Sequence, residues 1–260
     1  MSSIADAYST GAGAWEEGPI RIYRVLAELL VARAPVPLRG RRLLDLGTGT
    51  GAASRPALTA GARVTAVDTA FGMLALDRSE RPPGVVGDAL SLPFRSGAFG
   101  GVVAAFSLNH LVDAGAGVRE AHRVIGSGGF LLASTYANDD DHPVKQAVER
   151  ALGEQGWEAP GWYPETKRAM AAWGTIDAAT AAVERGGMDV VSVEHVKVPF
   201  PELAPEALVD WRLGMAQCAN FVAALDGDQR AAVMARAREV LGPEPEPLVR
   251  CVLFIVARAR

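Results

Sequence analysis

One segment constrains the fold of this chain more than any other: a short apolar run that leads directly into three alternating glycines. The run is Leu43–Leu46, the glycines are Gly47, Gly49 and Gly51, and a candidate helix begins at Ala52. Glycine allows a sharp turn and the close approach of a ligand, and the free N–H groups of a helix N-terminus face that ligand. A buried strand, glycine turn and helix in this order is typical of α/β folds that bind nucleotide-like molecules.

Apolar runs and helical segments alternate downstream of the loop. The apolar runs are 43–46, 64–67, 85–86, 101–106 and 130–134. This alternation predicts βαβ units on a parallel sheet. Before the loop, Pro19–Ala34 carries apolar residues at helical spacing and predicts an amphipathic helix.

The second half of the chain is organised differently. Residues 140–187 favour helices, Val190–Val198 reads as a valine-rich strand, a further helical block follows from 201, and Val249–Ala257 forms a last strand. A length of 260 residues suits one large domain. We therefore expect a single domain over 1–260, with an N-terminal helical lid at 1–38. Helical insertions at about 140–187 and 203–241 should cover a substrate pocket.

Charge and hydropathy exclude several classes of function. The net charge is −4 with no basic run, which gives no electrostatic footprint for nucleic acid. No apolar stretch is long enough to span a membrane, so we expect a cytoplasmic protein. The two cysteines, Cys218 and Cys251, suit buried thiols and indicate neither a disulfide framework nor a metal site. The oligomeric state stays open.

Three aspartates narrow the identity of the ligand, because Gly47-x-Gly49-x-x-Ala52 alone also fits a loose dinucleotide fingerprint. Asp45 directs a carboxylate toward the loop, which suits an ammonium group better than a pyrophosphate. Asp68 ends the second strand, where it can accept hydrogen bonds from ribose hydroxyls in either kind of cofactor. Asp88 follows the third strand, where it can accept from an adenine amino group.

Together these segments resemble the class I S-adenosylmethionine-dependent methyltransferases, over about half of the chain. The motifs are the glycine loop 44–51, the ribose segment 67–74, the adenine segment 87–94, the fourth strand with its sequel 102–111, and 123–129 before the fifth strand. One departure is Phe99-Gly100-Gly101, where the family usually has an aspartate after the phenylalanine.

The resemblance implies a fold, a cofactor and a set of contacts. The fold is a doubly wound, mostly parallel seven-stranded sheet, Rossmann-like, with an antiparallel last strand at Val249–Ala257. The cofactor is S-adenosylmethionine, with the glycines around its methionine part, Asp68 on the ribose, Met73 on the adenine face and Asp88 at the adenine rim. The cofactor-binding positions are Asp45, Gly47, Thr48, Gly49, Gly51, Asp68, Thr69, Met73, Asp88, Ala89, Leu90 and Phe106.

Substrate contacts should lie just beyond the carboxyl ends of the fourth and fifth strands and in the aromatic segments that can cover them. The candidates are Tyr8, Trp15, Asn109, His110, Tyr136, Trp162 and Tyr163. These aromatic residues favour an apolar or aromatic small molecule. His110 is the first candidate for a general base and His142 the second, although aligning the reactants can itself suffice for methyl transfer.

The function that follows is S-adenosylmethionine-dependent methyl transfer to an O, N or C nucleophile of a small molecule, in bacterial secondary metabolism. Two alternatives stay open. One is a protein of the same fold that uses S-adenosylmethionine for a non-methylating rearrangement or cyclisation, and the other is an NAD-dependent oxidoreductase. The residues do not name the acceptor.

Overall fold

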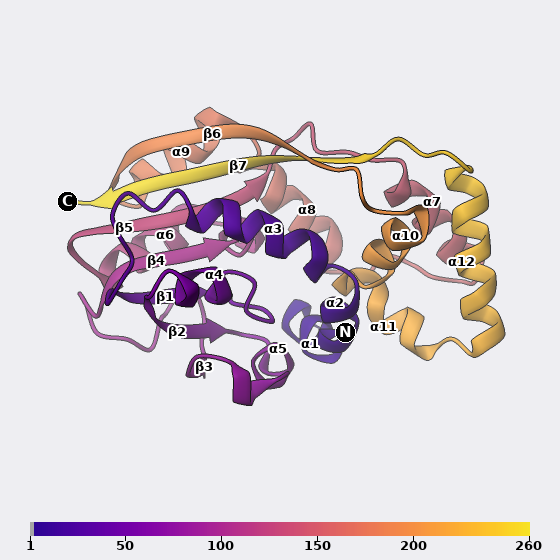
Figure 1. The fold of residues 1–260 in the computed structure, drawn as a ribbon, viewed down its shortest axis with the longest axis horizontal. Helices are drawn as coiled ribbons and strands as arrows, with labels where there is room; N and C mark the ends of the chain where they lie inside the picture. The colour runs from indigo at the N-terminus through magenta and orange to yellow at the C-terminus, as the bar shows by residue number, and fades with distance from the viewer. Residues whose placement is uncertain (1–2) are drawn as a thin grey trace.

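A seven-stranded mixed sheet forms the centre of the protein in a computed structural model that describes residues 3–260 (Figure 1). The strand order is β3-β2-β1-β4-β5-β7-β6, and β7 is antiparallel to both of its neighbours. The strands are β1 (Arg42–Leu46), β2 (Arg63–Asp68), β3 (Gly84–Val86), β4 (Phe99–Ala105), β5 (Ile125–Tyr136), β6 (Met188–Phe200) and β7 (Leu248–Ala259). The predicted doubly wound sheet with an antiparallel last strand is confirmed.

The strands lie where the apolar runs predicted them, and their ends differ. Strand β5 begins five residues before the predicted start at Phe130, because Ile125 already pairs with Phe99 of β4. Strand β3 is an exposed edge strand of three residues. The family departure falls at Gly100, where a Cβ atom would lie 3.7 Å from the Arg42 carbonyl oxygen, so the packing there does not require glycine. At the next residue, Gly101, a Cβ atom would lie 2.7 Å from the Phe130 ring, and glycine makes room for that ring.

Helices cover both faces of the sheet and its carboxyl-terminal edge. They are α1 (Ile4–Thr10), α2 (Ala12–Glu17), α3 (Ile20–Val31), α4 (Ser54–Thr59), α5 (Phe71–Ala75), α6 (Ala114–Val124), α7 (Val144–Gly153), α8 (Tyr163–Ala171), α9 (Ile176–Arg185), α10 (Pro205–Leu213), α11 (Ala216–Ala224) and α12 (Gly227–Leu241), with 3-10 turns η1 (Arg78–Glu80) and η2 (Leu108–His110). Helices α3 and α4 belong to the apolar core of one face, and α6 and α9 to that of the other.

The remaining helices form a cap beyond the carboxyl ends of the parallel strands. Helices α7, α10 and α12 pack together, α11 joins them to α1, and α8 packs against η2 (Figure 1). The N-terminal lid at 1–38 stays a prediction, and within this segment α3 buries Ile22, Leu26 and Leu30 completely in the sheet core. A lid would therefore consist of α1 and α2 alone.

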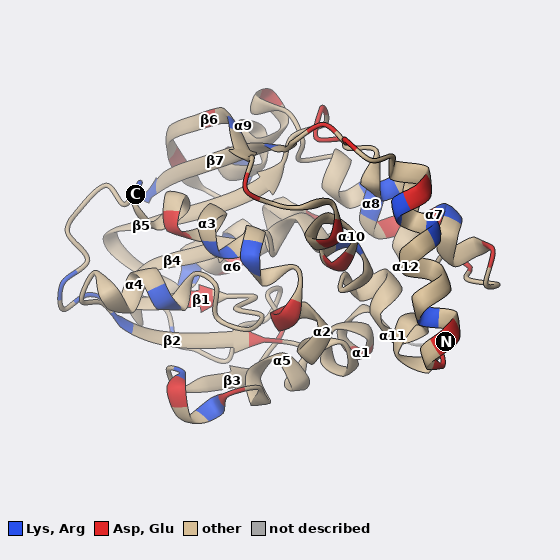
Figure 2. Cartoon of the chain, turned by 45° about the vertical axis from the view of Figure 1, so that its right-hand side comes forward, with Lys and Arg blue, Asp and Glu red and all other residues tan. Residues whose placement is uncertain are grey.

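Charged residues are spread over the whole molecule. Figure 2 shows Lys and Arg on many elements, mixed with Asp and Glu. No helix within residues 3–260 combines the length and the apolar character needed to span a bilayer.

Candidate active site

The glycine loop follows β1 in a conformation that demands glycine. Gly47, Gly49 and Gly51 have φ angles of +66°, +52° and +92°, a region that other residues adopt at a cost. At Gly47 a Cβ atom would also lie 2.3 Å from the Cβ atom of Ser107, which follows β4. The loop therefore packs directly on the end of β4 and presents bare backbone to whatever lies above it.

Asp45 anchors this loop and retains one free oxygen. Its Oδ2 atom accepts hydrogen bonds from Thr48 Oγ1 at 2.7 Å and Ser54 Oγ at 2.6 Å. Burial raises the pKa of the Asp45 carboxyl, and the two hydroxyl donors oppose that shift. Its Oδ1 atom is buried and has no partner among residues 3–260. Thr48 thus positions Asp45, and Oδ1 is available to a donor from a ligand.

Asp68 ends β2 and binds the loop from the other side. The N–H groups of Gly49 and Ala70 each donate to its carboxylate at 2.8 Å. Burial raises the pKa of Asp68, and these N–H groups oppose the rise. Two N–H donors leave further lone pairs on the carboxylate, so it can still accept from ribose hydroxyls.

Arg81 is a site residue that the sequence did not indicate. Its Nη2 atom donates to the Gly49 carbonyl at 2.7 Å, and its Nη1 atom donates to the Met73 carbonyl. Its buried Nε atom has no partner in the described part of the chain. Arg81 therefore places a guanidinium beside the loop. Burial lowers the pKa of Arg81, and the nearby charges of Asp45 and Asp68 oppose that shift.

The predicted adenine-side residues differ in exposure. Asp88 is exposed, with Oδ1 accepting from the Leu90 N–H at 2.9 Å, and Leu90 is exposed as well. Ala89 is half-buried and Thr69 is exposed. Met73 is 1% exposed and packs in the core, so its side chain contributes to packing in this structure. Asp88 and Leu90 thus stand at an open rim, apart from the enclosed Asp45.

Phe106 holds an unusual backbone conformation at the end of β4. Its φ angle is +53°, which costs a non-glycine residue about 1–2 kcal/mol. Its N–H donates to the carbonyl and the hydroxyl of Ser134, both at 3.2 Å. Strain of this kind concentrates at functional sites. The turn directs the Phe106 ring against Tyr136, with the ring centroids 4.5 Å apart.

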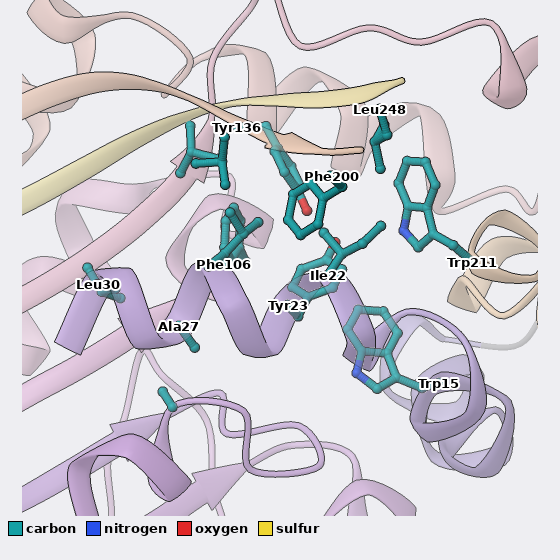
Figure 3. Close-up of a cluster of buried hydrophobic side chains, with 14 of the residues drawn as sticks. Trp15, Ile22, Tyr23, Ala27, Leu30, Phe106, Tyr136, Phe200, Trp211 and Leu248 are labelled. Atoms are coloured by element: carbon teal, nitrogen blue, oxygen red, sulfur yellow. The ribbon is translucent and has the colours of Figure 1, made fainter. Parts of the chain in front are cut away.

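Aromatic side chains that are far apart in the sequence meet above this turn, and Figure 3 shows Trp15, Tyr23, Phe106 and Tyr136 among them. Trp15 lies 4.7 Å from Tyr23, and Tyr23 lies 5.2 Å from Phe106 and 6.1 Å from Tyr136, centroid to centroid. Tyr8 adds an edge-on contact with Trp15 at 5.5 Å. The predicted substrate residues Tyr8, Trp15 and Tyr136 are thus brought together. Tyr23 was missed because its position in an amphipathic helix gives only a core signal.

His110 contacts the same cluster from η2 through the Tyr8 ring, and Asn109 precedes it in the chain. The Tyr8 hydroxyl lies 3.5 Å from His110 Nε2, and His110 Nδ1 is buried with no partner within residues 3–260. Burial lowers the pKa of His110 to about 4, so the imidazole is neutral near pH 7. Asn109 is 1% exposed, and neither atom of its amide has a hydrogen-bond partner in that same range. Such a buried amide marks a place for a ligand or water.

His142 is not a candidate base in this geometry. Its Nδ1 atom accepts from the Val144 N–H at 3.2 Å, which leaves Nε2 to donate to the Glu246 carbonyl at 2.9 Å. Both ring nitrogens are therefore used to hold the start of α7. Tyr163 lies outside the ring contacts of the cluster, and its hydroxyl accepts from Arg212 Nη2 at 3.0 Å. Trp162 contacts the Tyr163 ring, with the ring centroids 5.9 Å apart.

Comparison with known proteins places this site in a family context. Residues 44–133, from β1 to β5, match the model of a methyltransferase domain. The chain is 32% identical to a demethylmenaquinone methyltransferase of Clavibacter sepedonicus over 75% of its own length and 82% of that protein. It is 41% identical to the Mycolicibacterium gilvum enzyme of the same name over 37% of its own length, but this match spans only 42% of that relative.

Solved structures of similar shape extend over nearly the whole chain. Phosphoethanolamine N-methyltransferase 2 of Haemonchus contortus, in complex with S-adenosyl-L-methionine, has a TM-score of 0.61 at 17% identity, covering 99% of this chain and 60% of that one. The cyclase SpnF has a TM-score of 0.56 at 19% identity, covering 90% and 80%. At these identities the likeness concerns the fold alone.

Proposed function

We propose that this chain, which belongs to the class I S-adenosylmethionine-dependent methyltransferase family, transfers a methyl group to a small aromatic or apolar molecule. The observation that carries the proposal is the juxtaposition of two half-sites at the carboxyl edge of the sheet. The glycine loop with Asp45 and Asp68 forms one, and the aromatic cluster above Phe106 forms the other. Ligands of open α/β sheets bind at this edge.

The first half-site fits S-adenosylmethionine, which supplies an activated methyl group on its sulfonium sulfur. An amino-acid end needs an acceptor for its ammonium group and a donor for its carboxylate. Asp45 Oδ1 and Arg81 Nε are both buried with no partner among the described residues, and they lie beside the same loop. Asp68 would hold the ribose hydroxyls, and Asp88 would accept from the adenine amino group at the rim.

The second half-site would align the acceptor and exclude water. Alignment of nucleophile and methyl group in a dry pocket is the main task of such an enzyme. Trp15, Tyr23 and Tyr136 provide apolar faces with little room for solvent. His110 is neutral near pH 7 and could take a proton from an acceptor O–H or N–H at Nδ1 or Nε2.

The setting we propose is bacterial secondary metabolism, on the similarity in length and layout to methyltransferases that modify natural products. A second candidate is a non-methylating cyclisation, which the fold similarity to a cyclase supports at the level of the fold. Family membership removes the reason to consider an NAD-dependent oxidoreductase.

Release of S-adenosylhomocysteine tests the proposal. The purified chain is incubated with S-adenosylmethionine and a panel of phenols, aromatic acids, aromatic amines and a demethylmenaquinone, and acceptor-dependent release is measured. Release with a product heavier by one methyl group supports methyl transfer. Consumption of an acceptor with no change in mass and no release would favour the cyclisation, and the absence of both would remove the proposed function.

A further inference from the structure

Three of the four tyrosines of the chain, Tyr8, Tyr23 and Tyr136, lie at the acceptor half-site, and two buried arginines, Arg212 and Arg250, lie near them. Tyr23 and Tyr136 lie 6.1 Å apart, centroid to centroid, and Figure 3 shows both beside Phe200 and near Trp211. Burial raises the pKa of Tyr23, and the charge of Arg250, the neighbouring Tyr136 hydroxyl and the charge of Arg212 oppose that rise. Both guanidiniums therefore lie near the Tyr23 side chain, Arg250 on β7 and Arg212 on α10.

Arg250 is held rigidly and has one edge free. Its guanidinium carbon lies 3.9 Å from the centroid of the Tyr136 ring and 4.6 Å from that of the Trp211 ring. Its Nε and Nη2 atoms donate to Asp140 at 2.9 and 2.7 Å. The side chain is only 3% exposed, yet Nη1 has no acceptor within residues 3–260. The stacked rings and the bidentate pair fix where the free N–H groups lie.

Two other buried donors beside Arg250 also lack acceptors. Neither the Trp211 indole N–H nor the Tyr136 hydroxyl makes a hydrogen bond of good geometry in the part of the chain that is described, and the polar group nearest to the Tyr136 hydroxyl is that of Tyr23. Both belong to the two rings that stack on the Arg250 guanidinium. A buried donor without an acceptor destabilises the folded state, so three such donors in one place indicate a missing acceptor group.

The charges of this region point to an anion. Asp140 forms ion pairs with both Arg250 and Lys145, and its Oδ2 atom lies 3.1 Å from Lys145 Nζ. Arg212 forms an ion pair with Glu149. Three cations therefore share two carboxylates. Asp141 lies 3.8 Å from Lys145 but is exposed to solvent, which screens it. A buried positive charge is stable only when it is paired, and a ligand carboxylate would complete the pairing.

We propose that the methyl acceptor is an aromatic carboxylic acid that carries its O–H or N–H nucleophile on the ring, and whose carboxylate accepts hydrogen bonds from Arg250 Nη1, Trp211 Nε1 and the Tyr136 hydroxyl. The inference rests on the proposed function, because it identifies the acceptor of that same site. A carboxylate accepts several hydrogen bonds and donates none, which matches three groups that can each donate one. The rings of Tyr23 and Phe106 lie next to this donor group and would contact the aromatic part.

Matched acid and amide ligands test the proposal by calorimetry in the presence of S-adenosylhomocysteine. The pairs are benzoate with benzamide and 2-naphthoate with 2-naphthamide, and each pair keeps its ring while the charge is removed. We expect one acid to bind at least ten-fold tighter than its amide. The proposal is overturned if the wild type prefers the acid in neither pair. It is also overturned if the wild type binds none of the four ligands. Acetate that binds as tightly as the aromatic acid would reduce the site to a general anion site and also overturn it.

Variants assign the preference to the named donors. Tyr136→Phe and Trp211→Phe each keep an aromatic ring beside Arg250 and remove one donor, and each should lower the acid preference at least three-fold. Trp173→Phe is the matched control, since Trp173 is equally buried, also has no acceptor for its indole N–H among the described residues, and lies in the other core cluster. An acid preference unchanged in both site variants, or lowered equally in the control, contradicts the assignment.

The binding ratio does not depend on turnover, so the two claims can fail separately. An acid preference without methyl transfer to any acceptor would remove the proposed function and leave the anion site. Methyl transfer to neutral acceptors alone would leave the function and remove the carboxylate assignment.

Discussion

Replacing Asp68 with asparagine should weaken cofactor binding and loosen the glycine loop at the same time. The carboxylate accepts from Gly49 and Ala70 through separate oxygens, both at 2.8 Å. Asparagine has a single acceptor oxygen, so one of these N–H groups loses its partner and the ribose loses a charged acceptor. Each hydrogen bond to a charged group contributes about 1.5–3 kcal/mol.

The expected loss of affinity for S-adenosylhomocysteine is therefore about 10-fold to 100-fold. Isothermal titration calorimetry measures it, and thermal unfolding should show a fall in Tm of about 2–4 °C for each kcal/mol lost. Glu80→Ala, an exposed acid in the neighbouring η1 turn, is the control and should change neither value. A folded Asp68→Asn protein whose dissociation constant stays within two-fold of the wild type would refute the reasoning.

Three further predictions concern other parts of the site. If His110 removes a proton, His110→Gln should lower turnover by about a hundred-fold. The wild-type rate should then stay constant as the pH falls below neutrality, because the pKa of His110 is about 4. A fall in the wild-type rate centred near pH 6.5 would contradict this. The pKa of His110 is lower in the folded protein than in the unfolded chain, so the wild type should lose stability as the pH falls from 6.5 to 4. The loss should be at most about 3 kcal/mol relative to His110→Gln, and urea unfolding would measure it. Arg81→Ala should weaken S-adenosylhomocysteine binding about ten-fold through loss of one charged donor, whereas replacing the exposed Arg78 with alanine should not weaken it. Equal dissociation constants for the two variants would exclude a contact between Arg81 and the cofactor carboxylate. Gly72→Ala should displace α1, because its Cβ would lie 2.0 Å from the Ser9 carbonyl oxygen, and limited proteolysis should then cleave the N-terminal segment faster than in the wild type.

Local sequence carried enough information to predict the sheet and the loop. A positive φ angle at three alternating positions requires glycine, and those positions were visible as Gly47, Gly49 and Gly51. The last strand, Leu248–Ala259, was equally visible because it is apolar on both faces and buried at almost every residue. These features depend on residues close together in the chain.

Long-range partners could not be predicted in the same way. Arg250 pairs with Asp140 across 110 residues, and its surroundings in β7 gave only the pattern of a buried strand. Arg81 follows a short charged stretch that reads as a surface turn, although it reaches back to the loop. His142 was chosen for its place after the fifth strand, but both ring nitrogens are taken by backbone groups at the start of α7.

Transfer of a labelled methyl group tests the central claim most directly. The chain is incubated with S-adenosylmethionine that carries a deuterated methyl group and with ring-hydroxylated and ring-aminated forms of the acid that binds most tightly, and the products are analysed by mass spectrometry. The account predicts one labelled methyl group on the acid for each S-adenosylhomocysteine released, with a strongly reduced yield in Asp68→Asn. An unlabelled acid, recovered from a protein that binds both the cofactor product and the acid, would contradict it.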